Sequence, residues 1–88
     1  MYKISLSREA EKGLKNLRRS QPKHASQLKE KIGSLAYNPR PQDSQKVITR
    51  PGYLRVDSGE YRIFYKVFDN RKEIEITRVK HRKDAFRW

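Results

Sequence analysis

The side chains best suited to chemistry are cations and proton carriers in the second half of the chain. Arg55 and Arg62 flank a predicted turn, and Lys80, His81 and Arg82 follow one another near the end. Arginine binds phosphate oxygens through paired hydrogen bonds and stabilises developing negative charge. Histidine and lysine can act as general acids and bases. These residue types predict chemistry on a phosphate group.

Such a set can cleave RNA without a metal. The 2′-hydroxyl attacks its neighbouring phosphate, a base takes the hydroxyl proton, cations stabilise the phosphorane, and an acid protonates the leaving 5′-oxygen. The alternative for His81 is an exposed or capping residue. For His24, a surface or packing role is expected.

A binding surface for single-stranded RNA needs cations for phosphates and aromatic rings for bases. Interleaved residues of both kinds are candidates for it, with a solvated sheet face as the alternative. They are Tyr53, Phe64, Arg78, Lys83, Phe86, Arg87 and Trp88.

The composition supports an anionic partner and excludes several classes of protein. The 88 residues carry 22 Lys and Arg against 10 Asp and Glu, a net charge of +12, and no cysteine. Disulfide scaffolds, thiolate metal sites and thiol nucleophiles are therefore excluded. No apolar run is long enough for a membrane span and no secretory signal is present. We expect one cytoplasmic domain over residues 1–88, with no metal, cofactor or membrane partner.

The elements that position these residues follow from periodicity. Residues 2–6 predict a strand, Ser7 a helix N-cap, and residues 8–19 an amphipathic helix. A second helix runs from Pro22 to near Tyr37. After a polar loop, residues 53–57, 60–68 and 73–76 alternate as strands, and 47–49 is either a strand or a loop. The order β-α-α-β-β-β predicts an α+β fold, with the helical hairpin packed on a small, largely antiparallel sheet.

Strand register determines which cations meet on the sheet face away from the helices. A two-residue turn at Ser58 and Gly59 places Arg55 opposite Arg62, an unfavourable pairing that suits an anionic ligand. After Ile76 the alternation changes phase. A bulge near Thr77 or Arg78 would bring Arg78, Lys80 and Arg82 to that face. Without a bulge, Val79 and His81 lie there instead, or the strand end frays.

Two segments carry a family resemblance. The stretch from Tyr53 to Val67, with its Tyr61-Arg62 step, and the stretch from Ile76 to Phe86 resemble the RelE/ParE superfamily, the toxins of bacterial type II toxin–antitoxin pairs. The RelE branch implies an endoribonuclease that cuts mRNA in the ribosomal A site. The family's phosphate-binding cations fall on Arg55, Arg62 and Arg82. Its terminal tyrosine falls on Phe86, which has no hydroxyl and cannot exchange a proton, and the glycine before the histidine falls on Lys80.

The resemblance also implies partners: an acidic antitoxin, the ribosome with its 16S rRNA, and mRNA. The ParE branch shares the fold but poisons DNA gyrase, so a gyrase inhibitor is one alternative function. A non-catalytic module that binds RNA or the ribosome is the other, favoured by Phe86. Proton transfer would have to come from Lys80, His81 or a tyrosine such as Tyr53.

Overall fold

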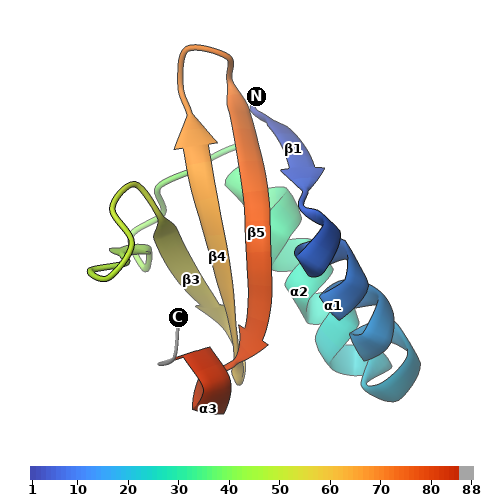
Figure 1. The fold of residues 1–88 in the computed structure, drawn as a ribbon. Helices are drawn as coiled ribbons and strands as arrows, with labels where there is room; N and C mark the ends of the chain where they lie inside the picture. The colour runs from blue at the N-terminus through green and yellow to red at the C-terminus, as the bar shows by residue number, and fades with distance from the viewer. Residues whose placement is uncertain (86–88) are drawn as a thin grey trace.

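The computed structural model describes residues 1–85 and has two layers, a helical hairpin and a sheet (Figure 1). The hairpin lies on one face of the sheet, which confirms the expected α+β fold. In the described residues no helix is long and apolar enough to span a membrane. The elements are β1 (Lys3–Leu6), α1 (Arg8–Ser20), α2 (Pro22–Leu35), β2 (Gln45–Lys46), β3 (Leu54–Ser58), β4 (Tyr61–Phe68), β5 (Glu73–His81) and α3 (Arg82–Ala85).

The two long helices begin where their first residues predict. The Ser7 hydroxyl accepts a hydrogen bond from the Ala10 amide at 3.1 Å, which confirms the N-cap of α1. Two glutamates in the first turn complement the helix dipole. Pro22 starts α2, where its missing amide proton costs no hydrogen bond.

The sheet has five strands in the order β1-β5-β4-β3-β2. β1 pairs with β5 in parallel, and the other neighbours are antiparallel. The additional strand is β2, which pairs with β3 through Gln45 and Arg55. Residues 47–49 lie in the loop between β2 and β3, so the loop alternative holds for them.

The predicted register of the β3–β4 hairpin is wrong by two residues. The turn consists of Gly59 and Glu60, so Arg62 lies opposite Asp57 and not opposite Arg55. Gly59 takes the first central position with φ at +60°, a conformation that a side chain would strain. A shift of two keeps every side chain on its predicted face, because the strand period is also two.

The predicted bulge is present in β5. The pairing with β4 shifts between Phe64 and Tyr65, which leaves Thr77 as the extra residue. Its hydroxyl donates to the Phe64 carbonyl at 2.9 Å, and its carbonyl accepts from the Ser7 hydroxyl at 2.6 Å. The bulge restores the alternation, so Arg78 and Lys80 share the face of Arg62.

The main core lies between the hairpin and the sheet. Its largest fully buried members include Tyr65, whose hydroxyl donates to the Pro39 carbonyl at 2.7 Å. At the β4–β5 turn, Asp69 accepts two hydrogen bonds from Arg40, at 3.1 and 2.8 Å, and one from the Tyr2 hydroxyl, at 2.7 Å. This exposed network ties the N-terminus and the loop after α2 to the end of the sheet.

Candidate functional site

Arg62 is the central cation of the open face, the sheet face away from the helices. It lies on β4 between Asp57 of β3 and Lys80 of β5, its two cross-strand neighbours. The guanidinium Nε is 3.4 Å from Asp57 Oδ1, but their alignment is too poor for a hydrogen bond. Directly opposed residues have Cβ atoms about 5 Å apart, so Arg62 and Lys80 form a like-charged pair. The sheet thus concentrates positive charge at one point.

Arg55 extends this cationic surface along β3. Its guanidinium donates to Gln45 Oε1 at 2.5 Å and lies 3.7 Å from Asp57 Oδ1. Asp57 therefore lies between the two arginines and contacts both. Asp57 is not among the site residues predicted from the sequence. Its position two residues after Arg55 on a strand nevertheless puts both side chains on one face.

Arg78 lies beside two hollows at the β5 side of the open face. Its guanidinium pairs with the carboxylate of Glu9, in the first turn of α1. The larger hollow, of about 330 Å³, also has Tyr53 and Arg50 in its wall. The smaller, of about 150 Å³, includes Lys80. Helix α1 and the loop before β3 thus border the same basic surface, which strand periodicity alone does not predict.

The aromatic candidates on this face differ in accessibility. Tyr53 is half-buried, with the Lys66 ammonium 4.9 Å from its ring centroid. Phe64 lies on the predicted face but is only 2% exposed. Phe64 is not part of the main core between the hairpin and the sheet, and the same holds for Ala85 of α3, which is also buried. In this structure the Phe64 ring is therefore covered, whereas Tyr53 reaches the wall of a hollow.

His81 lies away from the open-face arginines. It is paired with Tyr61 of β4, so it points to the helix-covered side of the sheet. Its ring is edge-on to Tyr61, with centroids 5.2 Å apart, and His24 of α2 contacts the same tyrosine at 5.4 Å. Tyr61 thus lies between the two histidines. No sequence pattern indicates this cluster, because His24 and His81 are 57 positions apart.

Arg82 does not continue β5 as expected but begins α3, and Lys83 is the second residue of that helix. Both are exposed, and within residues 1–85 no acidic side chain forms an ion pair with Lys80, Arg82 or Lys83. The candidates Phe86, Arg87 and Trp88 lie outside the described residues. Among the residues that are described, no three histidine or acidic side chains are grouped so that they could hold a metal ion.

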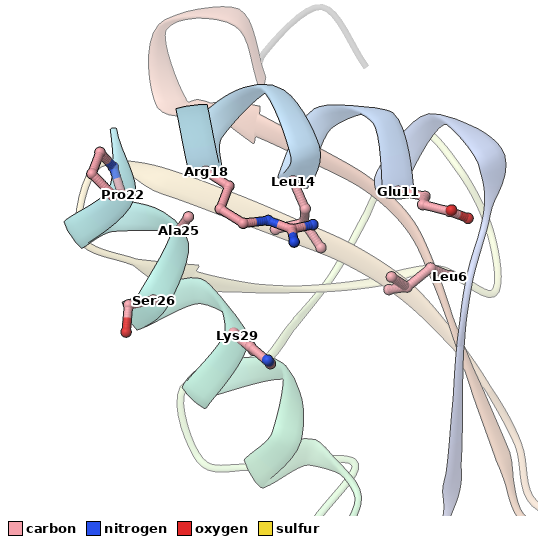
Figure 2. Close-up of a pocket in the computed structure, with 8 residues that line it drawn as sticks. All are labelled: Leu6, Glu11, Leu14, Arg18, Pro22, Ala25, Ser26 and Lys29. Carbon is pink, nitrogen blue, oxygen red and sulfur yellow. The ribbon is translucent and has the colours of Figure 1, made fainter. Parts of the chain in front are cut away.

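A further hollow, of about 380 Å³, lies on the helical side of the molecule (Figure 2). Leu6, Leu14 and Ala25 contribute apolar surface to it, and Arg18 and Lys29 contribute charge. It lies between α1 and α2, on the layer opposite the open face. Its lining offers a surface for contact but lacks the cluster of opposed cations that surrounds Arg62.

The fold and the site together are a small α+β domain, with a helical hairpin on one face of the sheet and a group of cations on the other. A sequence model of the ParE toxin of type II toxin–antitoxin systems, parDE, matches residues 4–86. The chain therefore belongs to the ParE toxin family, within the RelE/ParE superfamily. It is a toxin of a type II toxin–antitoxin system. No match is found among curated protein sequences.

Solved toxin structures share the fold. The archaeal RelE–RelB complex from Pyrococcus horikoshii matches at 27% identity and a TM-score of 0.75, over 92% of this chain and 94% of that one. The intact RelBE complex from E. coli matches at 23% identity and a TM-score of 0.77, over 92% and 96%. A YoeB/ParE toxin from Agrobacterium tumefaciens matches at 13% identity and a TM-score of 0.80, over 90% and 96%.

Proposed function

We propose that this toxin is an endoribonuclease that cleaves mRNA in the A site of the translating ribosome. The observation that carries the proposal is the opposed pair of Arg62 and Lys80, with Arg55 on the next strand. Like charges directly across two strands destabilise a sheet. An RNA phosphate bound over the open face would turn this unfavourable arrangement into a favourable one.

The reaction assigned to this face is attack by the 2′-hydroxyl on the adjacent phosphorus. The 2′-oxygen–phosphorus bond forms, the bond to the 5′-oxygen breaks, and a 2′,3′-cyclic phosphate results. Arg62 and Arg55 hold the non-bridging oxygens and stabilise their growing negative charge. Lys80 donates a proton to the leaving 5′-oxygen, while the hydroxyl proton passes to solvent. Arg82 adds positive charge from the start of α3.

The burial of Phe64 is consistent with assigning phosphate contacts to the arginines and base contacts to another ring. A buried ring gives the strand a rigid position between Arg62 and Lys66, and base contacts then come from Tyr53 at the hollow beside Arg78. Base stacking on an aromatic ring is worth about 1–3 kcal/mol per base. Tyr53 is therefore assigned to substrate binding, together with Arg78.

The experiment is to express the toxin during active translation and map the ends of cut transcripts. Arg62→Ala should lower the cleavage rate by about 100-fold or more, the typical cost of removing one charge-stabilising donor. Arg71→Ala is the matched control, because it removes the same charge from the β4–β5 turn, where Arg71 pairs with Glu73. Intact transcripts during a full arrest of translation, or no arrest, would refute the proposal.

A gyrase inhibitor is the second candidate, favoured by the ParE family model that matches residues 4–86. It predicts a DNA-damage response while mRNA remains intact. The same expression experiment separates the two, because RNA ends and the damage response are read from one culture.

We also propose that a cognate acidic antitoxin neutralises this toxin. The solved RelE–RelB and RelBE structures are complexes of toxin and antitoxin. A net charge of +12 favours an acidic partner for this chain. The exposed cations of α1 and α2 would also steer the toxin to the 16S rRNA of the ribosome, an attraction that added salt should weaken. Co-expression with the acidic product of an adjacent gene should abolish toxicity.

A further inference from the structure

Two contacts fasten the end of β5 to the turn between β3 and β4. The Arg82 amide donates a hydrogen bond to the Glu60 carbonyl at 2.8 Å. The adjacent His81 places Nε2 3.3 Å from Glu60 Oε2. Glu60 therefore holds two consecutive residues at the point where β5 ends and α3 begins.

The second ring nitrogen of His81 also has a structural partner. The Lys83 amide donates to His81 Nδ1 at 3.1 Å. A nitrogen that accepts a hydrogen bond carries no proton, so this contact assigns the neutral ring with its proton on Nε2, toward Glu60. Both nitrogens of His81 are thus occupied by the protein itself.

The contact with Lys83 has the geometry of a helix N-cap. His81 immediately precedes Arg82, the first residue of α3, and accepts from the amide of the second. An N-cap side chain satisfies a helix amide that would otherwise have no partner. The edge-on Tyr61 ring limits rotation of the imidazole. Within the described residues α3 runs from Arg82 to Ala85, and this cap satisfies an amide of its first turn.

We propose that His81 and Glu60 are positioning residues that set the direction of Arg82, and that His81 does not transfer a proton in the reaction. Arg82 comes two residues after Lys80, the cross-strand partner of Arg62. The backbone at this point decides whether the Arg82 guanidinium approaches the phosphate held by Arg62. The inference rests on the proposed RNA cleavage for its functional readout.

The test compares His81→Asn with His81→Ala in the full-length toxin, in a reconstituted translation reaction. Asparagine is a strong N-cap residue and its side-chain oxygen can accept from the Lys83 amide, yet it cannot act as an acid or base. We expect His81→Asn to cleave mRNA within about threefold of the wild-type rate, and His81→Ala to be at least tenfold slower. Equal and severe losses in both variants would overturn the proposal in favour of proton transfer.

His24→Ala is the matched control. It removes the other histidine that contacts Tyr61, a histidine that lies on α2 and is not the cap of α3, so cleavage should stay within about twofold of wild type. A loss as large as that of His81→Ala would show that the Tyr61 cluster as a whole, and not the cap, supports activity.

A second readout does not depend on cleavage. Nitrogen-15 NMR should show Nδ1 of neutral His81 without a proton, and amide exchange at Lys83 should accelerate in His81→Ala but not in His81→Asn. A proton on Nδ1, or equal exchange in all variants, would overturn the inference. If the wild-type toxin cuts no mRNA, the proposed function fails, and these spectra still decide the role of His81.

Discussion

Asp57 should weaken the proposed RNA binding, because it lies between the two arginines that we assign to the phosphate. Its Oδ1 is 3.4 Å from Arg62 Nε and 3.7 Å from Arg55 Nη1. A phosphate that binds both guanidinium groups competes with this carboxylate for their charge. Asp57→Asn keeps the side-chain shape but removes the charge, so we expect the variant to bind RNA more tightly.

The size of the effect follows from the exposure of the carboxylate. The Asp57 side chain is 58% exposed, so solvent screens both contacts. Exposed ion pairs contribute about 0.2–1 kcal/mol each, so the two together amount to about 1 kcal/mol. That free energy corresponds to about a fivefold change in the dissociation constant. The same contacts bound the loss of folding stability at about 1 kcal/mol.

The assay is fluorescence anisotropy with a short labelled single-stranded RNA, measured at several salt concentrations. Glu73→Gln is the matched control, because it also adds one positive charge and releases one arginine, Arg71, from an ion pair of 3.8 Å. Glu73 lies at the opposite end of β5 from Lys80, so its effect on binding reports overall charge alone.

The expected result is a dissociation constant about three- to fivefold lower for Asp57→Asn than for Glu73→Gln. Equal affinities for the two variants would refute the reasoning, since charge alone would then account for the change. Weaker binding by Asp57→Asn would show that the carboxylate holds the two arginines in a position that favours RNA, and that it does not compete with the RNA phosphate.

Three further predictions concern stability. Gly13→Ala should raise the free energy of unfolding, measured in urea, by about 0.5–1 kcal/mol, because alanine favours helix and an added Cβ would lie at an ordinary 3.7 Å from the Val79 carbonyl oxygen. A lower free energy of unfolding would show that this contact is too close. Tyr65→Phe should lower it by about 1 kcal/mol, since the Pro39 carbonyl loses its donor. Burial raises the pKa of Tyr65 to about 12, so wild-type stability should also fall above pH 10 and through pH 12, a fall that Tyr65→Phe should lack. Hydrogen bonds from Arg40 and Tyr2 lower the pKa of Asp69 to about 2, so the stability that this carboxylate contributes should be lost as the pH falls from about 4 to 2. Melting curves of Asp69→Asn should lack this part of the acid sensitivity.

The helices were predictable because their signals are local. A serine cap, a proline at the first turn and an apolar stripe each act within a few residues of the element they define. The bulge at Thr77 was also predictable. Ile74 and Ile76 face the core, and a single inserted residue is needed for Val79 to face it as well.

The pairing of Arg62 was not predictable to the same degree. A turn at Ser58 and Gly59 and a turn at Gly59 and Glu60 bury the same side chains, so hydrophobic pattern does not distinguish them. The structure replaces a predicted arginine pair with an Arg62–Asp57 contact on one side and an Arg62–Lys80 pair on the other. Positive charge is still concentrated around Arg62, but the opposed cation is Lys80 and not Arg55.

Strand periodicity is a property of the local backbone, so the order of residues is enough to predict which side chains of a strand share a sheet face. This periodicity therefore placed Arg55 and Arg62 on one surface, and Arg78 and Lys80 with them on condition of a bulge near Thr77 or Arg78. The folded chain alone shows that Asp57 lies between Arg55 and Arg62, that Phe64 is covered, and that His81 is held by Glu60 and the start of α3. These facts depend on register and on contacts between distant segments, which are selected by packing of the whole chain.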